Sequence, residues 1–274
     1  MQVIIFTDLD GSLLNHEDYS FAAARPSIER IKRAGIPLII ATSKTRQEVE
    51  LLQREMGIWE PFIVENGAGI FVPRGYRNWV VEKGERKGDY TLIRIGTTYS
   101  AIRHFVKMVG ARFEIRGFGD MTPEEISGLT GLPPDRAKMA KSREFTEPFL
   151  LKRPDDIDAL RELAAGNELK VTRGGRFHHL TGKEQDKGAA VRIVRDLFSI
   201  HSGEALITIG LGDSENDLPM LEQMDTPVLM PRPGKGYLDV RLPGLVWARK
   251  PGSRGWNEVV ERLLDEYAKV ATQG

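Results

Sequence analysis

Short apolar runs alternate with amphipathic segments at both ends of the chain. The first part predicts strands at 3–6, 37–41 and 62–65, and helices at 27–34 and 45–56. The last part predicts strands at 205–211, 227–230 and 245–248, and helices at 187–198, 215–224 and 256–271. Strands that alternate with helices of about ten residues form βαβ units. Both ends of the chain therefore predict a parallel sheet.

The middle of the chain, about 85–185, follows a different pattern. It predicts strands at 91–95, 145–151, 169–172 and 177–180, and helices at 100–109, 123–129 and 155–164, without steady alternation. Such a mixture is typical of an α+β module. We therefore predict an α/β fold in which a Rossmann-like parallel sheet core, 1–84 and 186–274, is interrupted by an inserted α+β domain, 85–185. Segments 83–88 and 182–186 are the expected linkers.

Composition excludes several classes of protein. The chain has 274 residues, with 39 Lys plus Arg and 39 Asp plus Glu, so its formal net charge is zero. This balance argues against nucleic-acid and polybasic membrane partners. The absence of cysteine excludes disulfides, Cys-ligated metals and a thiol nucleophile. The start lacks the features of a signal peptide and no run is long enough to span a membrane, so we expect a cytoplasmic location.

Two acidic residues, Asp8 and Asp10, directly follow the first predicted strand. Ligands of open α/β sheets bind at the carboxyl ends of strands, so this position suits a functional site. Two carboxylates this close repel each other unless a cation or a proton lies between them. Mg²⁺, which prefers oxygen ligands, is the natural cation. A polar turn with a capping Asp is the alternative interpretation.

A second acidic cluster, Asp213-Ser214-Glu215-Asn216-Asp217, follows the strand at 205–211. Acidic residues suit the first turn of a helix, and an ordinary N-cap at Asp213 or Ser214 is the structural alternative. In a parallel sheet, however, the ends of two strands can lie side by side. Carboxylates from both clusters could then surround one metal ion.

Ser43 and Lys187 each stand at the start of a predicted helix. The hydroxyl of Ser43 and the following helix N-terminus could bind an anion, although a simple N-cap is the commoner use of Ser. A lysine at a helix N-terminus opposes the helix dipole, which favours an anionic partner for Lys187 over plain solvation. Together with the carboxylates, these groups are what phosphoryl transfer through an aspartyl-phosphate requires.

In this arrangement the sequence resembles the haloacid dehalogenase superfamily of phosphohydrolases. All four signature elements are present in order: Asp8-x-Asp10, Ser43, Lys187 and the segment from Gly212 to Asp217. The resemblance implies that Asp8 is the nucleophile and that Asp10 acts as general acid and then as general base. It implies a Mg²⁺ ion held by Asp8, the backbone carbonyl of Asp10 and Asp213, supported by Asn216 and Asp217. Phosphate would be bound by Ser43, Lys44 and Lys187.

The insert is similar to the cap of the mannosyl-3-phosphoglycerate phosphatase family. The similarity rests on segments 117–122, 129–132, 143–149 and 174–180, together with Ser43-Lys44-Thr45 in the core. It implies hydrolysis of a sugar phosphate to mannosylglycerate, a compatible solute, and phosphate.

Substrate contacts in the cap are expected from seven residues. They are Arg143, Glu147, Arg173, Gly174, Gly175, Arg176 and His178. Arginine suits bidentate recognition of a carboxylate, although a surface ion pair is the alternative for each arginine. Side chains of adjacent strand residues point to opposite faces, so at most one of His178 and His179 faces the cleft, and the family pattern favours His178.

Other functions stay open at this point. The core motifs also fit phosphatases that act on glucosyl-3-phosphoglycerate, sucrose-phosphate or a broad range of sugar phosphates. A phosphomutase shares the Asp-x-Asp chemistry but returns the phosphoryl group to its product. A phospho-accepting receiver would be a single small domain with no place for the insert, and a non-catalytic module would not need every catalytic group. The sequence predicts a small-molecule sugar phosphate as the partner and does not predict an oligomeric state.

Overall fold

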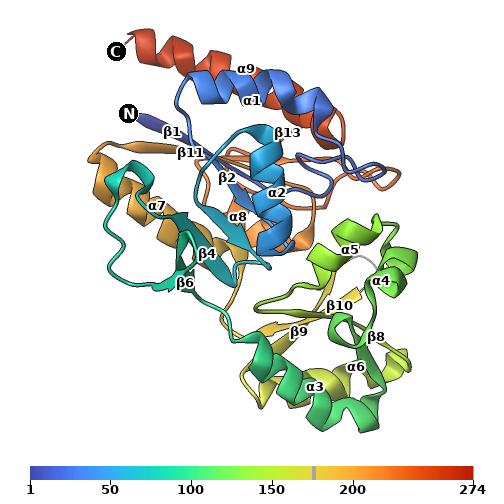
Figure 1. Ribbon diagram of the computed structural model, residues 1–274. Coiled ribbons are helices and arrows are strands. Elements are labelled where there is room, and N and C mark those ends of the chain that lie inside the picture. The colour runs from blue at the N-terminus through green and yellow to red at the C-terminus, as the bar shows by residue number, and fades with distance from the viewer. Residues whose placement is uncertain (175–176, 274) are drawn as a thin grey trace.

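Two β-sheets form the framework of the protein (Figure 1). The computed structural model describes residues 1–174 and 177–273. In this part of the chain the larger sheet has nine strands in the order β13-β12-β11-β1-β2-β3-β4-β6-β5. Its strands are β1 Gln2–Thr7, β2 Leu38–Ala41, β3 Phe62–Val64, β4 Gly69–Pro73, β5 Glu85–Lys87, β6 Tyr90–Arg94, β11 Leu206–Gly212, β12 Thr226–Leu229 and β13 Val246–Trp247.

The central strand β1 determines where the two acidic clusters lie. It pairs in parallel with β2 on one side and with β11 on the other, with Gln2 opposite Leu206 and Thr7 opposite Leu211. The parallel pairing continues through β3 and β13, whereas β4, β6 and β5 are antiparallel. Because β1 and β11 end at the same edge of the sheet, the loops that follow them are neighbours.

Helices cover both faces of the larger sheet. Helices α1 Arg25–Arg33, α2 Arg46–Met56 and α9 Gly252–Gln273 contribute to one apolar cluster, and α7 Lys187–Ser202 and α8 Leu218–Leu221 contribute to the other. Successive strand residues point to opposite faces. Accordingly Ile5 packs in the first cluster with Trp256, whereas Ile4 and Phe6 pack in the second with Val194. The apolar runs seen in the sequence are therefore strands that are buried on both sides.

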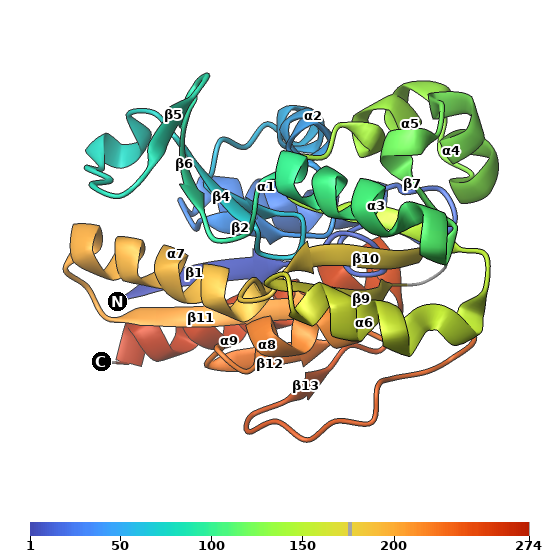
Figure 2. The same cartoon turned by 90° about the horizontal axis from the view of Figure 1, so that it is seen from below.

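The smaller sheet is antiparallel, in the order β7-β8-β10-β9. Its strands are β7 Ile115–Gly117, β8 Glu147–Leu151, β9 Leu169–Gly174 and β10 Phe177–Gly182. Helices α3 Tyr99–Phe113 and α6 Ile157–Ala165 pack on one face, and Figure 2 views the molecule from the end that carries them. Helices α4 Pro123–Thr130 and α5 Pro134–Lys141 pack with Phe118 and Phe177 in a separate cluster. Short 3₁₀ helices lie at Ala22–Ala24, Tyr76–Asn78, Phe118–Asp120, Pro154–Asp156 and Glu215–Asp217.

The predicted fold class is confirmed, since a mainly parallel α/β sheet is combined with a separate antiparallel α+β part. Strands β5 and β6 extend the larger sheet, although they belong to the segment predicted as the start of the insert. The chain passes between the two sheets near residues 95–98 and 182–186. The division into two domains stays a prediction. No helix in the described residues is long and apolar enough to cross a membrane.

Candidate active site

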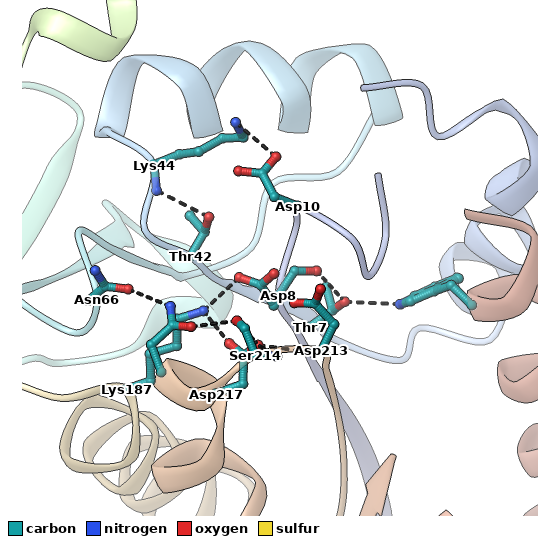
Figure 3. Close-up of polar contacts among 12 residues, drawn as sticks. Thr7, Asp8, Asp10, Thr42, Lys44, Asn66, Lys187, Asp213, Ser214 and Asp217 are labelled. Atoms are coloured by element: carbon teal, nitrogen blue, oxygen red, sulfur yellow. Dashed lines mark hydrogen bonds and ion pairs between the residues drawn. The ribbon is translucent and has the colours of Figure 1, made fainter. Parts of the chain in front are cut away.

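The site lies at the carboxyl edge of the larger sheet, where β1 and β11 end side by side (Figure 3). Asp8 is the first residue after β1, and its backbone N–H donates to the carbonyl of Leu211 over 2.8 Å. Asp213 is the first residue after β11. The neighbouring strand ends therefore bring together the two acidic clusters that the sequence separates by about 200 residues.

Lys187 links the acidic residues. Its ammonium nitrogen lies 2.6 Å from Oδ1 of Asp8 and 2.6 Å from Oδ1 of Asp217. The lysine begins α7, where the side chain of Asp186 caps the helix by accepting from the N–H of Ala189. Lys187 is 1% exposed, so this positive charge is held inside the protein by two carboxylates. The unfavourable position at a helix N-terminus is thus offset by the anionic partners that the sequence led us to expect.

Asp217 already uses both of its carboxylate oxygens. Oδ1 accepts from Lys187, and Oδ2 accepts from the N–H of Asp213 and from the N–H and hydroxyl of Ser214, each over 3.0 Å. These donors fix the loop that follows β11. Asp217 is therefore suited to supporting the loop and Lys187, whereas Asp8 and Asp213 keep oxygens available for a further ligand.

The three buried carboxylates fit a divalent cation. One oxygen each from Asp8, Asp213 and Asp217 lie within 4.8 Å of one another. If all three are ionised, their formal charge of three is only partly balanced by the single charge of Lys187. A hard cation that prefers oxygen ligands, such as Mg²⁺, matches both the donor set and the remaining negative charge.

Burial and mutual repulsion shape the protonation of this cluster. Burial, followed by the negative charge of Asp217, raises the pKa of Asp8 well above 3.8, and Lys187 only partly opposes this rise. Burial alone would lower the pKa of Lys187, but the carboxylates of Asp217 and Asp8 outweigh it and raise that pKa above its usual value. Lys187 therefore stays charged while Asp8 is held in an environment that disfavours its negative charge.

Asp10 lies beyond a sharp turn and pairs with a second lysine. The ammonium nitrogen of Lys44 lies 3.0 Å from Oδ1 of Asp10, 3.6 Å from Oε1 of Glu48 and 5.0 Å from the ring centre of Tyr19. Burial lowers the pKa of Lys44, but Asp10 and Glu48 reverse this and raise it above its usual value. The predicted phosphate-binding lysine is therefore a buried cation next to the predicted acid–base residue.

Gly11 allows this turn. Its φ of +81° lies in the left-handed region, which glycine adopts more readily than any residue with a side chain. A Cβ at this position would lie 2.4 Å from Oδ2 of Asp213 and 2.4 Å from Nε2 of His16. The same carboxylate oxygen of Asp213 lies 3.3 Å from Nε2 of His16, and this hydrogen bond is the main reason that the pKa of His16 is raised. The contact between His16 and Asp213 was not predicted from the sequence.

The end of β2 contributes Thr42 and Ser43. Ser43, the predicted phosphate-binding residue, accepts a 2.8 Å hydrogen bond through its carbonyl from Nη1 of Arg143. Thr42 directly follows β2 and is fully buried, with its hydroxyl accepting from the N–H of Lys44 over 3.2 Å. Thr42 thus stands in the same position after its strand as Asp8 does. Sequence analysis missed this residue, although the strand-end rule that selected Asp8 would also have selected Thr42.

Asn216 joins two loops at this edge of the sheet. Its amide nitrogen donates to the side-chain oxygen of Asn66 over 2.9 Å. Asn66 follows β3, so the contact links the loop after β11 to the loop after β3. Asn216 therefore has a structural partner in addition to its predicted role beside the metal.

Arg143 is the cap candidate that the structure brings to the catalytic loops. It lies between α5 and β8, and its guanidinium contacts the carbonyls of Ser43 and Ala140, at 2.8 and 2.9 Å, and lies over the ring of Phe118. No carboxylate among the described residues forms a salt bridge with it. Arg143 therefore brings an uncompensated positive charge to the edge of the site.

Glu147 and His178 lie inside the antiparallel part of the protein. Glu147 is 0% exposed and accepts hydrogen bonds from the hydroxyl of Tyr99 at 2.7 Å, from Arg103 at 3.1 Å and from the N–H of Gly119 at 2.9 Å. The ring of His178 packs on Phe149, in the layer beneath α3 and α6. These positions favour structural roles within the cap over direct substrate contacts.

The remaining cap candidates lie around the hairpin of β9 and β10. Arg173 is exposed and is paired with His178 across the ladder, and Gly174 ends β9. Gly175 and Arg176 lie outside the described residues. None of these residues is placed against the carboxylate cluster by a contact in the structure.

Comparison with known proteins identifies clear relatives. A family model described as haloacid dehalogenase-like hydrolase matches residues 5–85. A glucosyl-3-phosphoglycerate/mannosyl-3-phosphoglycerate phosphatase from Persephonella marina is 55% identical over 96% of this chain and 98% of its own. A protein of the same name from Methanococcoides burtonii is 41% identical over 96% and 98% of the two chains. A mannosyl-3-phosphoglycerate phosphatase from Pyrococcus horikoshii is 36% identical over 81% and 88%.

Solved structures share the fold at low sequence identity. A haloacid dehalogenase-like hydrolase from Bacteroides thetaiotaomicron superimposes with a TM-score of 0.68 at 15% identity, covering 96% of this chain and 100% of the other. The sucrose-phosphatase from Synechocystis, solved with sucrose and phosphate, gives a TM-score of 0.59 at 16% identity, with 95% and 97% covered. These similarities extend over both sheets and show the fold alone.

Proposed function

The chain belongs to the family of glucosyl-3-phosphoglycerate/mannosyl-3-phosphoglycerate phosphatases among the haloacid dehalogenase-like hydrolases, and we propose that it releases phosphate from both glycosyl-3-phosphoglycerates. As a member of this family it is a phosphoric monoester hydrolase. The observation that carries the choice of substrates is the 55% identity, over 96% of the chain, to a relative named for both activities. The products would be inorganic phosphate and mannosylglycerate or glucosylglycerate.

Asp8 is the nucleophile in this proposal. One carboxylate oxygen of Asp8 is held by Lys187, and the other makes no hydrogen bond within the described residues, so it is free to attack phosphorus. As the new O–P bond forms, the bond to the glycerate oxygen breaks and that oxygen takes a proton from Asp10. Water then attacks the aspartyl-phosphate while Asp10 takes up the proton, and phosphate leaves with Asp8 restored.

The positive groups around the site would offset the charge of the phosphoryl group. Lys187 stays charged between Asp8 and Asp217, and Lys44 brings a second buried cation beside Asp10. The hydroxyls of Ser43 and Thr42, at the end of β2, are the nearest uncharged donors in the chain order of the site. Asp8, the carbonyl of Asp10 and Asp213 would hold Mg²⁺, which when bound supplies further positive charge to the phosphate oxygens.

Arg143 is our candidate for reading the glycerate carboxylate. The two lysines of the site are already paired with carboxylates, whereas Arg143 contacts only carbonyl oxygens and an aromatic ring. A guanidinium without an acidic partner is suited to bind a carboxylate through two parallel hydrogen bonds. Sugar phosphates that lack a carboxylate would not use this contact, which would give the enzyme a chemical basis for preferring phosphoglycerate esters.

The proposal is tested by measuring phosphate release with Mg²⁺ from four substrates. These are mannosyl-3-phosphoglycerate, glucosyl-3-phosphoglycerate, sucrose-6-phosphate and mannose-6-phosphate. We expect kcat/KM for the first two to exceed that for the others by about 100-fold, which corresponds to about 2.7 kcal/mol of transition-state discrimination. Equal rates on all four would leave a phosphatase of broad specificity, and conversion to an isomeric phosphate without release would instead show a mutase.

A further inference from the structure

Three stretches of the chain lie between the two sheets at one place. Segments 95–98 and 182–186 carry the chain from one sheet to the other, and segment 143–146 precedes β8. Glu65, from the loop after β3, lies at this place and is 0% exposed. Its backbone has a positive φ of 50°, in the left-handed region, so the loop turns sharply at this residue.

The Glu65 carboxylate binds segment 143–146 through three donors. Oε1 accepts from the N–H of Glu144 over 2.8 Å, and Oε2 accepts from the N–H of Phe145 over 3.1 Å and from the hydroxyl of Thr146 over 2.7 Å. Phe145 and Thr146 are themselves buried. One side chain of the larger sheet's loops thus satisfies three consecutive residues that lead into the smaller sheet.

The backbone of Glu65 binds the second connecting segment through Gln185. The Gln185 amide nitrogen donates to the carbonyl of Glu65 over 3.0 Å, and its side-chain oxygen accepts from the N–H of Gly182 over 2.9 Å. The first connecting segment packs against the same side chain, because a Cβ at Gly96 would lie 2.4 Å from the Gln185 oxygen. All three stretches therefore meet at Glu65 and Gln185.

Contacts farther from this point are more exposed. Arg136 of α5 pairs with Glu55 of α2 over 2.8 Å, and both side chains are about one third exposed. Arg143 reaches the carbonyl of Ser43 from a partly buried position. Exposed ion pairs form and break readily in water, whereas a buried carboxylate that accepts three hydrogen bonds does not. The contacts near Glu65 are thus built to persist, while the outer ones can open.

We propose that Glu65 is a positioning residue, a fixed pivot about which the smaller sheet and its helices turn to bring Arg143 over the catalytic loops. Arg143 directly precedes the residues that Glu65 holds, so loss of this anchor would misplace the guanidinium. The role in turnover rests on the proposed function of the site. The anchoring itself does not depend on which phosphate ester is hydrolysed.

The test compares Glu65→Gln with the wild type. Glutamine keeps the shape but offers only one accepting oxygen, so at least one of the backbone N–H groups of Glu144 and Phe145 loses its acceptor. We expect hydrogen exchange at these two amides to become about 10-fold faster or more. We also expect kcat/KM for the preferred glycosyl-3-phosphoglycerate to fall by about 10-fold, mainly through KM, while hydrolysis of p-nitrophenyl phosphate, which has no carboxylate to be read, stays within about 3-fold.

Glu60→Gln is the matched control, since Glu60 is a largely buried carboxylate in the preceding segment that binds the hydroxyl of Tyr76 and does not touch the smaller sheet. It should leave exchange at Glu144 and Phe145 and both activities unchanged. Unchanged exchange in Glu65→Gln, or an equal fall on both substrates, would overturn the proposal. If the wild type hydrolyses neither glycosyl-3-phosphoglycerate, the proposed function fails, whereas the exchange measurement still decides whether Glu65 is the anchor.

Thr146→Val keeps the test valid if Glu65→Gln does not fold. Valine preserves the size of the side chain and removes only the hydroxyl donor, so Glu65 keeps both backbone partners. We expect a smaller change in the same direction, with faster exchange at Phe145 and a higher KM for the glycosyl substrate. Wild-type exchange and an unaltered KM in this variant would contradict the pivot.

Discussion

The ammonium nitrogen of Lys187 lies 2.6 Å from a carboxylate oxygen of Asp8, with the two side chains 0% and 7% exposed. Removing one member of a buried ion pair leaves the other charge without a partner, which typically costs about 3–5 kcal/mol. Here Asp217 would lose the same partner. We therefore expect Lys187→Met to lower the free energy of unfolding by about 3 kcal/mol or more, measured by urea denaturation without divalent ions.

Lys250→Met is the control for this prediction. Lys250 also forms an ion pair, with Glu258, but both side chains are more than 40% exposed. Pairs of this kind contribute about 0–1 kcal/mol. Saturating Mg²⁺ should return part of the lost stability to Lys187→Met, because a cation bound to the carboxylates relieves their repulsion. Equal losses in both variants would contradict the account of the buried cluster.

Asp8→Asn tests the nucleophile. The amide has nearly the size of the carboxylate and its oxygen can still accept from Lys187, so the fold should be retained. Turnover should fall by about 1,000-fold or more, because a neutral amide cannot form the aspartyl-phosphate. Phosphate release by the purified variant, with its unfolding curve alongside, makes the comparison. Asp18→Asn, at an exposed aspartate, is the control, and near wild-type turnover in Asp8→Asn would rule out the mechanism.

Asp213→Asn and Asp217→Asn separate a metal ligand from its support. Asp217 is saturated by Lys187 and the donors of the loop, whereas Asp213 has an open oxygen. We expect Asp213→Asn to weaken Mg²⁺ binding by about 10-fold or more and to reduce the Mg²⁺-dependent rise of Tm accordingly. Asp217→Asn should chiefly lower the Tm of the metal-free protein. The reverse pattern, read from calorimetric titration and thermal unfolding, would exchange the two roles.

Arg143→Lys and His178→Gln test which cap residues touch the substrate. Lysine keeps the charge but cannot form two parallel hydrogen bonds, so we expect KM for glycosyl-3-phosphoglycerates to rise by about 10-fold. His178 packs on Phe149 beneath α3 and α6, and its replacement should leave kcat/KM within about 3-fold while lowering Tm slightly. Steady-state kinetics on both variants settle this, and a large KM effect confined to His178→Gln would restore the original prediction for that residue.

The ion pair between Arg103 and Asp120 should make stability depend on pH. The hydrogen bond from Arg103 lowers the pKa of Asp120 below 3.8. A group whose pKa is lowered on folding stabilises the protein above its unfolded pKa, and this contribution disappears as the pH falls through the folded pKa. The difference in unfolding free energy between wild type and Asp120→Asn should therefore be largest above about pH 5 and shrink below 3.8. A difference that stays constant from pH 7 to about pH 3 would exclude this linkage.

The sequence predicted the parallel part of the larger sheet because each of its central strands is an uninterrupted apolar run. The structure adds β4, β5, β7 and α5, which were not predicted. Strand β4 has only three apolar residues between a glycine and a proline, and β5 is entirely charged. Helix α5 carries four charged residues in eight. Antiparallel edges and exposed helices bury too few side chains to leave a clear hydrophobic pattern.

In the same way, part of the candidate site followed from position in the sequence and part did not. Asp8 and Asp213 stand directly after buried strands, so the strand-end rule brought them together before the structure was considered. The contact between Glu65 and the residues about 80 positions later has no comparable signal, because it depends on how the two sheets meet. Glu147 is a similar case, since its three partners come from elements whose packing the sequence does not specify.

The pairing of β1 with β11 also governs when activity can appear during synthesis. Residues 2–7 pair with residues 206–211, so β1 must wait for a neighbour that the ribosome adds about 200 residues later. At about 5–20 residues per second, this delay is about 10–40 seconds. Until then β1 has a free edge and Asp8 has neither Lys187 nor Asp213 beside it. A nascent or truncated chain that ends before β11 therefore carries the nucleophile without the rest of its site, and hydrolysis begins only when synthesis is nearly complete.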